Sequence, residues 1–215
     1  MSVLERSTLP NVITVGRILM APAVFFLILA PGFWDLLVCF TLFIIAAVSD
    51  LWDGHLARKY GWVSDFGKLA DPIADKLLLV ATFVPFYILS HRPGPLGELP
   101  VWGTLPLWVV LVVLGREVLI TALRTWAARH GQVLAAGRAG KHKAVVQNVF
   151  VGSAILWYAL RSRALEHHWA GSLWESWRVL HGSVLAASLA VAVILTLYSM
   201  VVYLRSWRVL VRGTG

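Results

Sequence analysis

Six long apolar segments limit the folds open to this chain. They lie at about 12–30, 35–58, 72–90, 105–129, 142–161 and 182–204. A helix needs about 20 apolar residues to cross the hydrocarbon core of a bilayer. Segments of this length cross as α-helices, which satisfy their own backbone hydrogen bonds. The sequence therefore predicts an all-α, polytopic membrane protein of about six transmembrane helices, with one domain over residues 1–215.

The composition and the placement of basic residues support this prediction. Only 14% of the residues are charged, against about 25% in soluble domains. The net charge of +8 is not a sign of nucleic-acid binding, because 14 of the 19 Lys and Arg residues gather on the face shared by both termini. Four lie opposite and Arg116 lies inside a span. Such a bias predicts cytoplasmic termini.

Two further segments carry expectations of their own. The first apolar segment follows Glu5 without a convincing cleavage site, so we expect it to be retained. The stretch 163–181 holds Trp169, Trp174 and Trp177 among mixed charges. We expect an interfacial turn or a short amphipathic helix there.

Four aspartates beside or within the second and third apolar segments form the main candidate site. Asp50 and Asp53 are three residues apart and Asp71 and Asp75 four apart, so each pair shares one face of its helix. The residues between Arg58 and Asp71 suffice for a turn between antiparallel helices, which lets the pairs face each other. Clustered carboxylates raise one another's pKa unless cations neutralise them. Two divalent ions, Mg²⁺ or Mn²⁺, match this charge and oxygen chemistry.

Each residue also has a structural interpretation. Asp71 followed by Pro72 is a good helix N-cap. Asp50 and Asp53 could pair with Arg58 and Lys59 at a membrane edge. Gly54 and Ala57 are common in helix packing.

The pattern Asp50-x2-Asp53-Gly54-x2-Ala57-Arg58-x8-Gly67-x3-Asp71-x3-Asp75 resembles the signature of the CDP-alcohol phosphotransferase family. The resemblance implies that all four aspartates hold metal and that Asp75 also acts as base on the acceptor hydroxyl. It further implies a multi-pass enzyme of the inner (cytoplasmic) membrane and a homodimer, which is common in the family. The Lys and Arg bias places the aspartates, and so the active site, on the cytoplasmic side. The implied CDP-lipid contacts are Asn11, Thr14, Gly54, Ala57, Arg58 and Ser64.

Three further stretches narrow the resemblance to family members that use glycerol 3-phosphate. These are LPNVITVGR from Leu9, GREVLITALR from Gly115 and GKHKAVVQ from Gly140, although Ala144-Val145 replaces the usual Thr residues. The implied reaction moves the phosphatidyl group of CDP-diacylglycerol to glycerol 3-phosphate, giving phosphatidylglycerophosphate and CMP. The candidate ligands of the acceptor phosphate are Arg116, Arg124, Lys141 and Lys143, since guanidinium and ammonium groups suit a phosphate dianion.

Alternatives remain open for these cations and for the function. Arg116 could pair with an aspartate or with Glu117, and Lys141 and Lys143 could mark only the cytoplasmic side. Other members of the family carry out inositol-phosphate, serine or cardiolipin synthesis, and these reactions are the alternatives within the family. A cation transporter is the alternative from another class, since acids within spans also mark ion paths.

Overall fold

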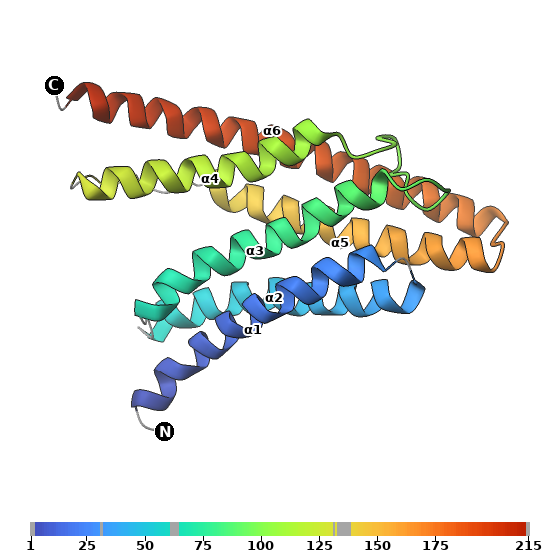
Figure 1. Cartoon of the computed structure of the whole chain (residues 1–215), viewed down its shortest axis with the longest axis horizontal. Helices are drawn as coiled ribbons and strands as arrows, with labels where there is room; N and C mark the ends of the chain where they lie inside the picture. The colour runs from blue at the N-terminus through green and yellow to red at the C-terminus, as the bar shows by residue number, and fades with distance from the viewer. Residues whose placement is uncertain (1–2, 31, 61–64, 131, 133–138, 214–215) are drawn as a thin grey trace.

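The described part of the chain contains six helices (Figure 1). They are α1 Val3–Leu29, α2 Phe33–Tyr60, α3 Asp65–Ser90, α4 Leu107–Arg129, α5 Ala139–Glu166 and α6 Ser172–Gly213. The structure is a computed structural model that describes residues 3–30, 32–60, 65–130, 132 and 139–213, with side chains except at 3–10, 51–60, 65, 68, 69, 139–141 and 209–213. Within these ranges the only β-type pairing is an isolated bridge between Leu99 and Gly103. The all-α prediction is confirmed.

Five of these helices contain stretches long and apolar enough to cross a membrane. The stretches are Asn11–Leu29, Phe33–Asp50, Ala70–Ser90, His142–Glu166 and Ser172–Arg208. In α4, which does not meet that criterion, Arg116, Glu117 and Arg124 interrupt the apolar residues, yet α4 packs within the bundle against α3 and α6. The chain is therefore a polytopic membrane protein, as the apolar segments predict.

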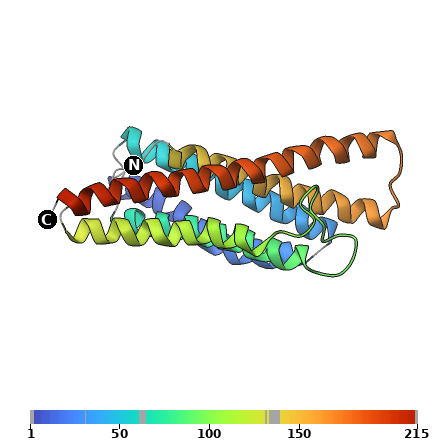
Figure 2. The ribbon, with the colours of Figure 1, turned by 90° about the horizontal axis from the view of Figure 1, so that it is seen from above.

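The helices run alternately up and down one long axis, so both termini lie at the same end of the molecule (Figures 1 and 2). We call this the terminal end, and the opposite end, with the connections 91–106 and 167–171, the distal end. α1 packs on α2 and α3, α2 on α5, and α5 on α6. The side of the membrane that each end faces stays a prediction.

An aromatic cluster between α3 and α5 holds the middle of the bundle together. The ring of Phe150 lies 5.5 Å from that of Phe83 and 6.1 Å from that of Phe86. Phe86 also stacks on Tyr158 at 6.0 Å. All four side chains are buried. Such well-packed aromatic contacts fix α3 against α5, and thereby fix the polar residues that both helices carry toward the terminal end.

Several helices extend beyond the expected segments, among them α1, which begins at Val3 rather than near residue 12. α3 begins at Asp65 rather than near residue 72, and α6 begins at Ser172 rather than near residue 182. Of the two alternatives expected for 163–181, a turn is present at 167–171 between α5 and α6, whereas a separate short helix is not, because residues 172–181 form the first part of α6. Residues 172–181 contain no proline or glycine to break the helix. The turn uses Gly171, whose φ of 118° suits glycine.

Candidate active site

A buried arginine on α1 joins the aspartates of α2 and α3. The Arg17 side chain is only 2% exposed, and its Nη1 lies 2.7 Å from Oδ1 of Asp50. Its Nη2 pairs with Asp75. One turn earlier on α1, Thr14 Oγ1 donates a hydrogen bond of 2.6 Å to Oδ1 of Asp71. Three of the four predicted carboxylates, from two helices, therefore converge on one stretch of α1.

A pocket of about 130 Å³ opens beside this cluster. Its lining comes from five helices and consists of Arg17, Phe43, Ala47, Asp50, Asp75, Lys76, Leu78, Leu79, Thr82, Glu117, Lys143, Ala144, Gln147, Asn148 and Val151. The acidic groups Asp50, Asp75 and Glu117 share it with basic side chains and with an apolar portion. A pocket of mixed charge next to hydrocarbon suits a substrate with a phosphate head and a lipid body.

Of the predicted acceptor ligands whose side chains are described, Lys143 lines the pocket. It is buried and pairs with Glu117 Oε1. The same oxygen accepts a 2.9 Å hydrogen bond from Arg116 Nη1, and Arg116 Nε donates to Ser199 Oγ at 3.1 Å. The pairing of Arg116 with Glu117, which the sequence left open, is thus present. It links Arg116 to the pocket through one carboxylate.

The second arginine of α4 lies against α6. Arg124 Nη2 donates to the hydroxyl of Tyr203. The guanidinium carbons of Arg124 and Arg116 lie 5.2 and 5.5 Å from the centroid of the Tyr203 ring, within the range of a cation–π interaction. Tyr203 therefore holds both arginines on the side of α4 that faces α6, and neither lines the pocket.

Several predicted site residues fall outside the described side chains. These are Asp53, Gly54, Ala57, Arg58 and Lys141, while Ser64 lies outside the described residues altogether. Asn11 is described and lies on α1 one turn before Thr14, where it is partly buried. The capping interpretation of Asp71 is wrong, because α3 begins six residues earlier, at Asp65.

The described carboxylates have the chemistry of a divalent-metal site. Asp50, Asp71 and Asp75 supply hard oxygen ligands, which Mg²⁺ and Mn²⁺ prefer, and Arg17 meets part of the need of the cluster for positive charge. Among the described side chains, no three of the usual ligand residues are close enough to hold one ion together, and Asp53 lies outside that set. The donor set fits a metal, and its assembly around one stays a prediction.

Arg17 is a site residue that the sequence predictions missed. They counted it only among the basic residues of the cytoplasmic face. A signal was present, because Arg17 follows Thr14 by three residues within an apolar segment, and a cation there demands a partner.

We expect Arg17→Gln to destabilise the protein because Asp50 and Asp75 lose their shared cation. Breaking a fully buried ion pair costs about 3–5 kcal/mol. The Asp50 and Asp75 side chains are 41% and 56% exposed, so water screens the pairs and a loss of about 1–3 kcal/mol is expected. Unfolding in detergent would measure it, with Arg163→Gln as the matched control because Arg163 pairs at the distal end with Glu166. Equal stability of the two variants would contradict this role.

Together these features define a polytopic membrane protein with a charged, carboxylate-rich site at one end of its bundle. Residues 7–211 match the model of the CDP-alcohol phosphatidyltransferase family. The chain therefore belongs to this family of membrane transferases, and the resemblance seen in the aspartate pattern is confirmed.

Relatives with assigned names agree with this membership. The chain is 33% identical over 210 residues to CDP-diacylglycerol–glycerol-3-phosphate 3-phosphatidyltransferase 1 of Arabidopsis thaliana, covering 95% of this chain and 64% of that protein. It is 31% identical over 202 residues to the Pectobacterium atrosepticum enzyme of that activity, covering 93% and 94%. A cardiolipin synthase (CMP-forming) of Oryza sativa subsp. japonica is 32% identical over 216 residues, covering 95% and 59%. The chain spans less than two thirds of the two plant proteins and nearly all of the bacterial one.

Proposed function

We propose that this chain transfers the phosphatidyl group of CDP-diacylglycerol to glycerol 3-phosphate, giving phosphatidylglycerophosphate and CMP. The observation that carries the proposal is that Asp75 and Lys143 line the same pocket. A carboxylate that can take a hydroxyl proton and a cation that can bind a phosphate suit a phosphorylated alcohol. The relatives named for this reaction support the choice of acceptor.

Asp75 is the proposed general base. In the reaction, a primary hydroxyl oxygen of glycerol 3-phosphate forms a bond to the phosphorus that bears diacylglycerol. The bond from that phosphorus to the phosphate oxygen of CMP breaks, and the hydroxyl proton passes to the Asp75 carboxylate. Arg17, which pairs with Asp75, orients that carboxylate toward the pocket.

Asp50, Asp53, Asp71 and Asp75 are the residues that would hold two Mg²⁺ or Mn²⁺ ions. Such ions would neutralise the diphosphate of the donor and the charge that develops on the departing CMP. Gly54, Ala57 and Arg58, with Asn11, Thr14 and Ser64, are the proposed contacts of the CDP group, by resemblance to the family.

The acceptor phosphate is proposed to bind Lys143 first. Lys143 lines the pocket. Arg116 is linked to Lys143 because both side chains pair with the carboxylate of Glu117. Arg124 and Lys141 would extend this basic region toward the terminal end. Free serine and free inositol lack a phosphate group that could bind to these basic residues.

Lys143→Gln is expected to raise the KM for glycerol 3-phosphate and to leave the KM for CDP-diacylglycerol within about threefold. A charge-assisted hydrogen bond contributes about 1.5–3 kcal/mol, which corresponds to about 10- to 150-fold in acceptor affinity. Steady-state CMP release at varied acceptor concentrations would measure this. Arg163→Gln is the control for loss of a cation, since it lies at the distal end. A raised donor KM with an unchanged acceptor KM would show that the basic residues are misassigned.

We further propose that the protein lies in the inner (cytoplasmic) membrane and that its terminal end faces the cytoplasm. The excess of Lys and Arg toward this end supports the orientation, which would give water-soluble glycerol 3-phosphate direct access to the pocket. Labelling of a cysteine placed at either terminus in sealed vesicles tests it. A homodimer is a further possibility by family resemblance, and crosslinking in membranes tests it.

An acceptor panel tests the proposed reaction itself. Purified protein is given CDP-diacylglycerol with glycerol 3-phosphate, glycerol, serine, inositol, inositol phosphate or phosphatidylglycerol, and CMP release is followed. The proposal expects release with glycerol 3-phosphate far above all others. A preference for phosphatidylglycerol would instead indicate cardiolipin synthesis, the activity of the rice relative, and would overturn the proposal.

A further inference from the structure

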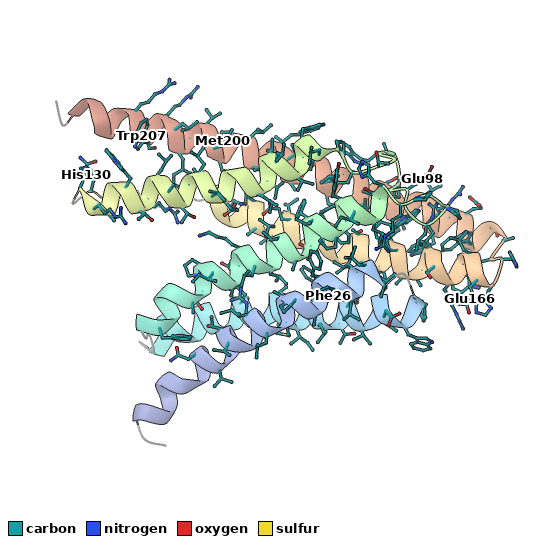
Figure 3. The ribbon with its side chains drawn as sticks, in the orientation of Figure 1. Phe26, Glu98, His130, Glu166, Met200 and Trp207 are labelled. Carbon is teal, nitrogen blue, oxygen red and sulfur yellow. The ribbon has the colours of Figure 1, made fainter. Side chains whose placement is uncertain are left out.

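The distal end carries a second group of charged and aromatic residues, remote from the aspartates. There the α5–α6 hairpin projects beyond the other helices (Figure 2). Glu98 and Glu166 lie at this end, whereas His130 and Trp207 lie at the terminal end (Figure 3). The connection that contains Glu98 is tied to the hairpin, because Trp157 Nε1 donates to the Glu98 carbonyl at 3.3 Å. Nothing in the proposed reaction uses this region.

Stacked aromatic rings make this part of the hairpin rigid. Trp177 stacks on Trp157 at 5.7 Å, on Trp174 at 5.0 Å and on His181 at 4.6 Å, with interplanar angles of 11°, 16° and 12°. Trp169 meets Trp174 edge to face at 5.6 Å. Tryptophan is the residue most typical of the interface between hydrocarbon and headgroups. The stacked tryptophans therefore suit a position at the level of the lipid headgroups.

Two arginines, Arg161 and Arg178, line a pocket together with three of these tryptophans. The pocket has a volume of about 140 Å³ and is lined by Trp157, Arg161, Ala164, Leu165, Trp169, Trp174 and Arg178. This lining contains two guanidinium groups. The carboxylate of Glu175 lies outside the lining and pairs with Arg178 Nη2 at 2.8 Å, with the two side chains 51% and 54% exposed for Arg178 and Glu175. Arg161 lies over Trp157 at 5.6 Å, and its Nη2 is 3.9 Å from Oε2 of Glu98, a distance beyond a hydrogen bond. Its guanidinium thus retains donors for an anion.

A second pocket shares both arginines with the first. It has a volume of about 280 Å³, is also lined by Trp157, and has the acidic residue Glu98 in its lining. Val101 and Val179 also line it and are 89% and 65% exposed. The arginines therefore line both pockets, and the exposed Val101 and Val179 give the second pocket an apolar part that suits acyl chains joined to a phosphate. Glu98, the acidic residue of this second pocket, has a side chain that is 72% exposed.

The depth of the arginines along the bundle points to lipid. Arg161 follows Lys143 by 18 residues of the same helix, which is about 27 Å at 1.5 Å per residue. The hydrocarbon core is about 30 Å thick. Because Lys143 lies at the pocket beside the aspartates, Arg161 lies about one hydrocarbon thickness away. This depth is that of the headgroups of the opposite leaflet.

We propose that Arg161 and Arg178 bind the phosphate of an anionic phospholipid from the leaflet opposite the aspartate cluster. The phosphodiester accepts hydrogen bonds from both guanidinium groups, the indoles of Trp157 and Trp174 flank the headgroup, and the acyl chains run along Val179. Basic pockets between transmembrane helices bind such headgroups in other membrane proteins. The site is independent of the proposed reaction and remains meaningful if the acceptor is another alcohol.

A binding titration tests the proposal. The full chain in detergent is titrated with short-chain phosphatidylglycerol, short-chain phosphatidylcholine or sodium phosphate, and intrinsic tryptophan fluorescence is followed. Phosphatidylglycerol is expected to bind the wild type tightest. Arg161→Gln and Arg178→Gln should each weaken that binding about tenfold or more. Arg163→Gln is the matched control, because Arg163 lies on the same hairpin, pairs with Glu166 and does not line the pocket.

The other outcomes are decisive as well. CMP release and melting temperature near those of the wild type would show that Arg161→Gln and Arg178→Gln fold normally, and that the lost binding is local. Equal affinity for phosphatidylcholine, or an equal loss in Arg163→Gln, would overturn the proposal. If sodium phosphate alone saturated the change and blocked further change by lipid, the site would be one for a free anion and the lipid assignment would fail.

Discussion

Asp75→Asn is expected to lower turnover by about 10²- to 10⁴-fold, the usual contribution of a general base, while CDP-diacylglycerol still binds. The amide keeps the shape of the carboxylate and cannot take the acceptor proton. Asp75 lines the pocket together with Lys143, so its carboxylate lies where an acceptor hydroxyl would be presented. The rate of CMP release at saturating substrates gives turnover, and equilibrium binding of the donor is measured separately.

Asp50→Asn is the control for this experiment, because it removes a carboxylate of the same cluster that is not assigned to proton transfer. It should weaken binding of both metal and donor, and excess Mn²⁺ should restore part of its activity. Excess Mn²⁺ should not rescue Asp75→Asn. Turnover of Asp75→Asn within about threefold of the wild type would remove Asp75 from the role of base.

The all-α fold was predictable from the apolar segments, five of which lie in helices long and apolar enough to cross a membrane, while the charged residues of α4 keep that helix below the criterion. The ends of the helices were less predictable from the sequence. Near Asp65 and Ser172 the sequence becomes polar, yet the helices continue. α3 does so through Gly67 and Pro72, whereas residues 172–181 of α6 contain neither residue type. Hydropathy reports where lipid begins and does not report where a helix ends.

The spacing within each helix predicts which aspartates share a face. The way Asp50 and Asp75 come together was not predictable from the short connection, because in the described residues α2 and α3 each pack closely on α1 and are not themselves a closely packed pair. The role of α1 was not accessible in this way. That Arg17 and Thr14 meet these carboxylates depends on how α1 packs on α3, which no local pattern specifies.

The basic residues of α4 illustrate the same limit. Helical spacing places Arg116 and Arg124 on one face, and this is correct. It does not reveal that Tyr203 of α6 lies against both of them, or that Glu117 lies between Arg116 and Lys143. Which of these cations reaches the acceptor phosphate therefore depends on the tertiary contacts of α6 and α5, and the Lys143→Gln measurement addresses that choice directly.

Removal of divalent cations is expected to abolish CMP release altogether. The donor brings a diphosphate to a cluster in which Asp50 and Asp75 already share one cation, Arg17. The negative charges of the diphosphate and the aspartates repel each other strongly in a partly buried site. The donor should therefore neither bind nor react without added positive charge. Treatment with EDTA followed by dialysis should remove activity, and Mg²⁺ or Mn²⁺ should restore it.

Donor binding and stability distinguish metal loss from unfolding in this experiment. The ion pairs of Arg17 bridge α1 to α2 and α3 without any metal, so the chelated protein should stay folded and melt cooperatively. Its affinity for CDP-diacylglycerol should fall at least about tenfold and return with Mn²⁺. Chelated Arg17→Gln, which lacks this bridge, should lose more stability than the chelated wild type and recover more of it when Mn²⁺ is added. Full activity after exhaustive chelation would exclude the metal site and leave Arg17, Lys76 and Lys143 as the cations available to the donor in the described pocket.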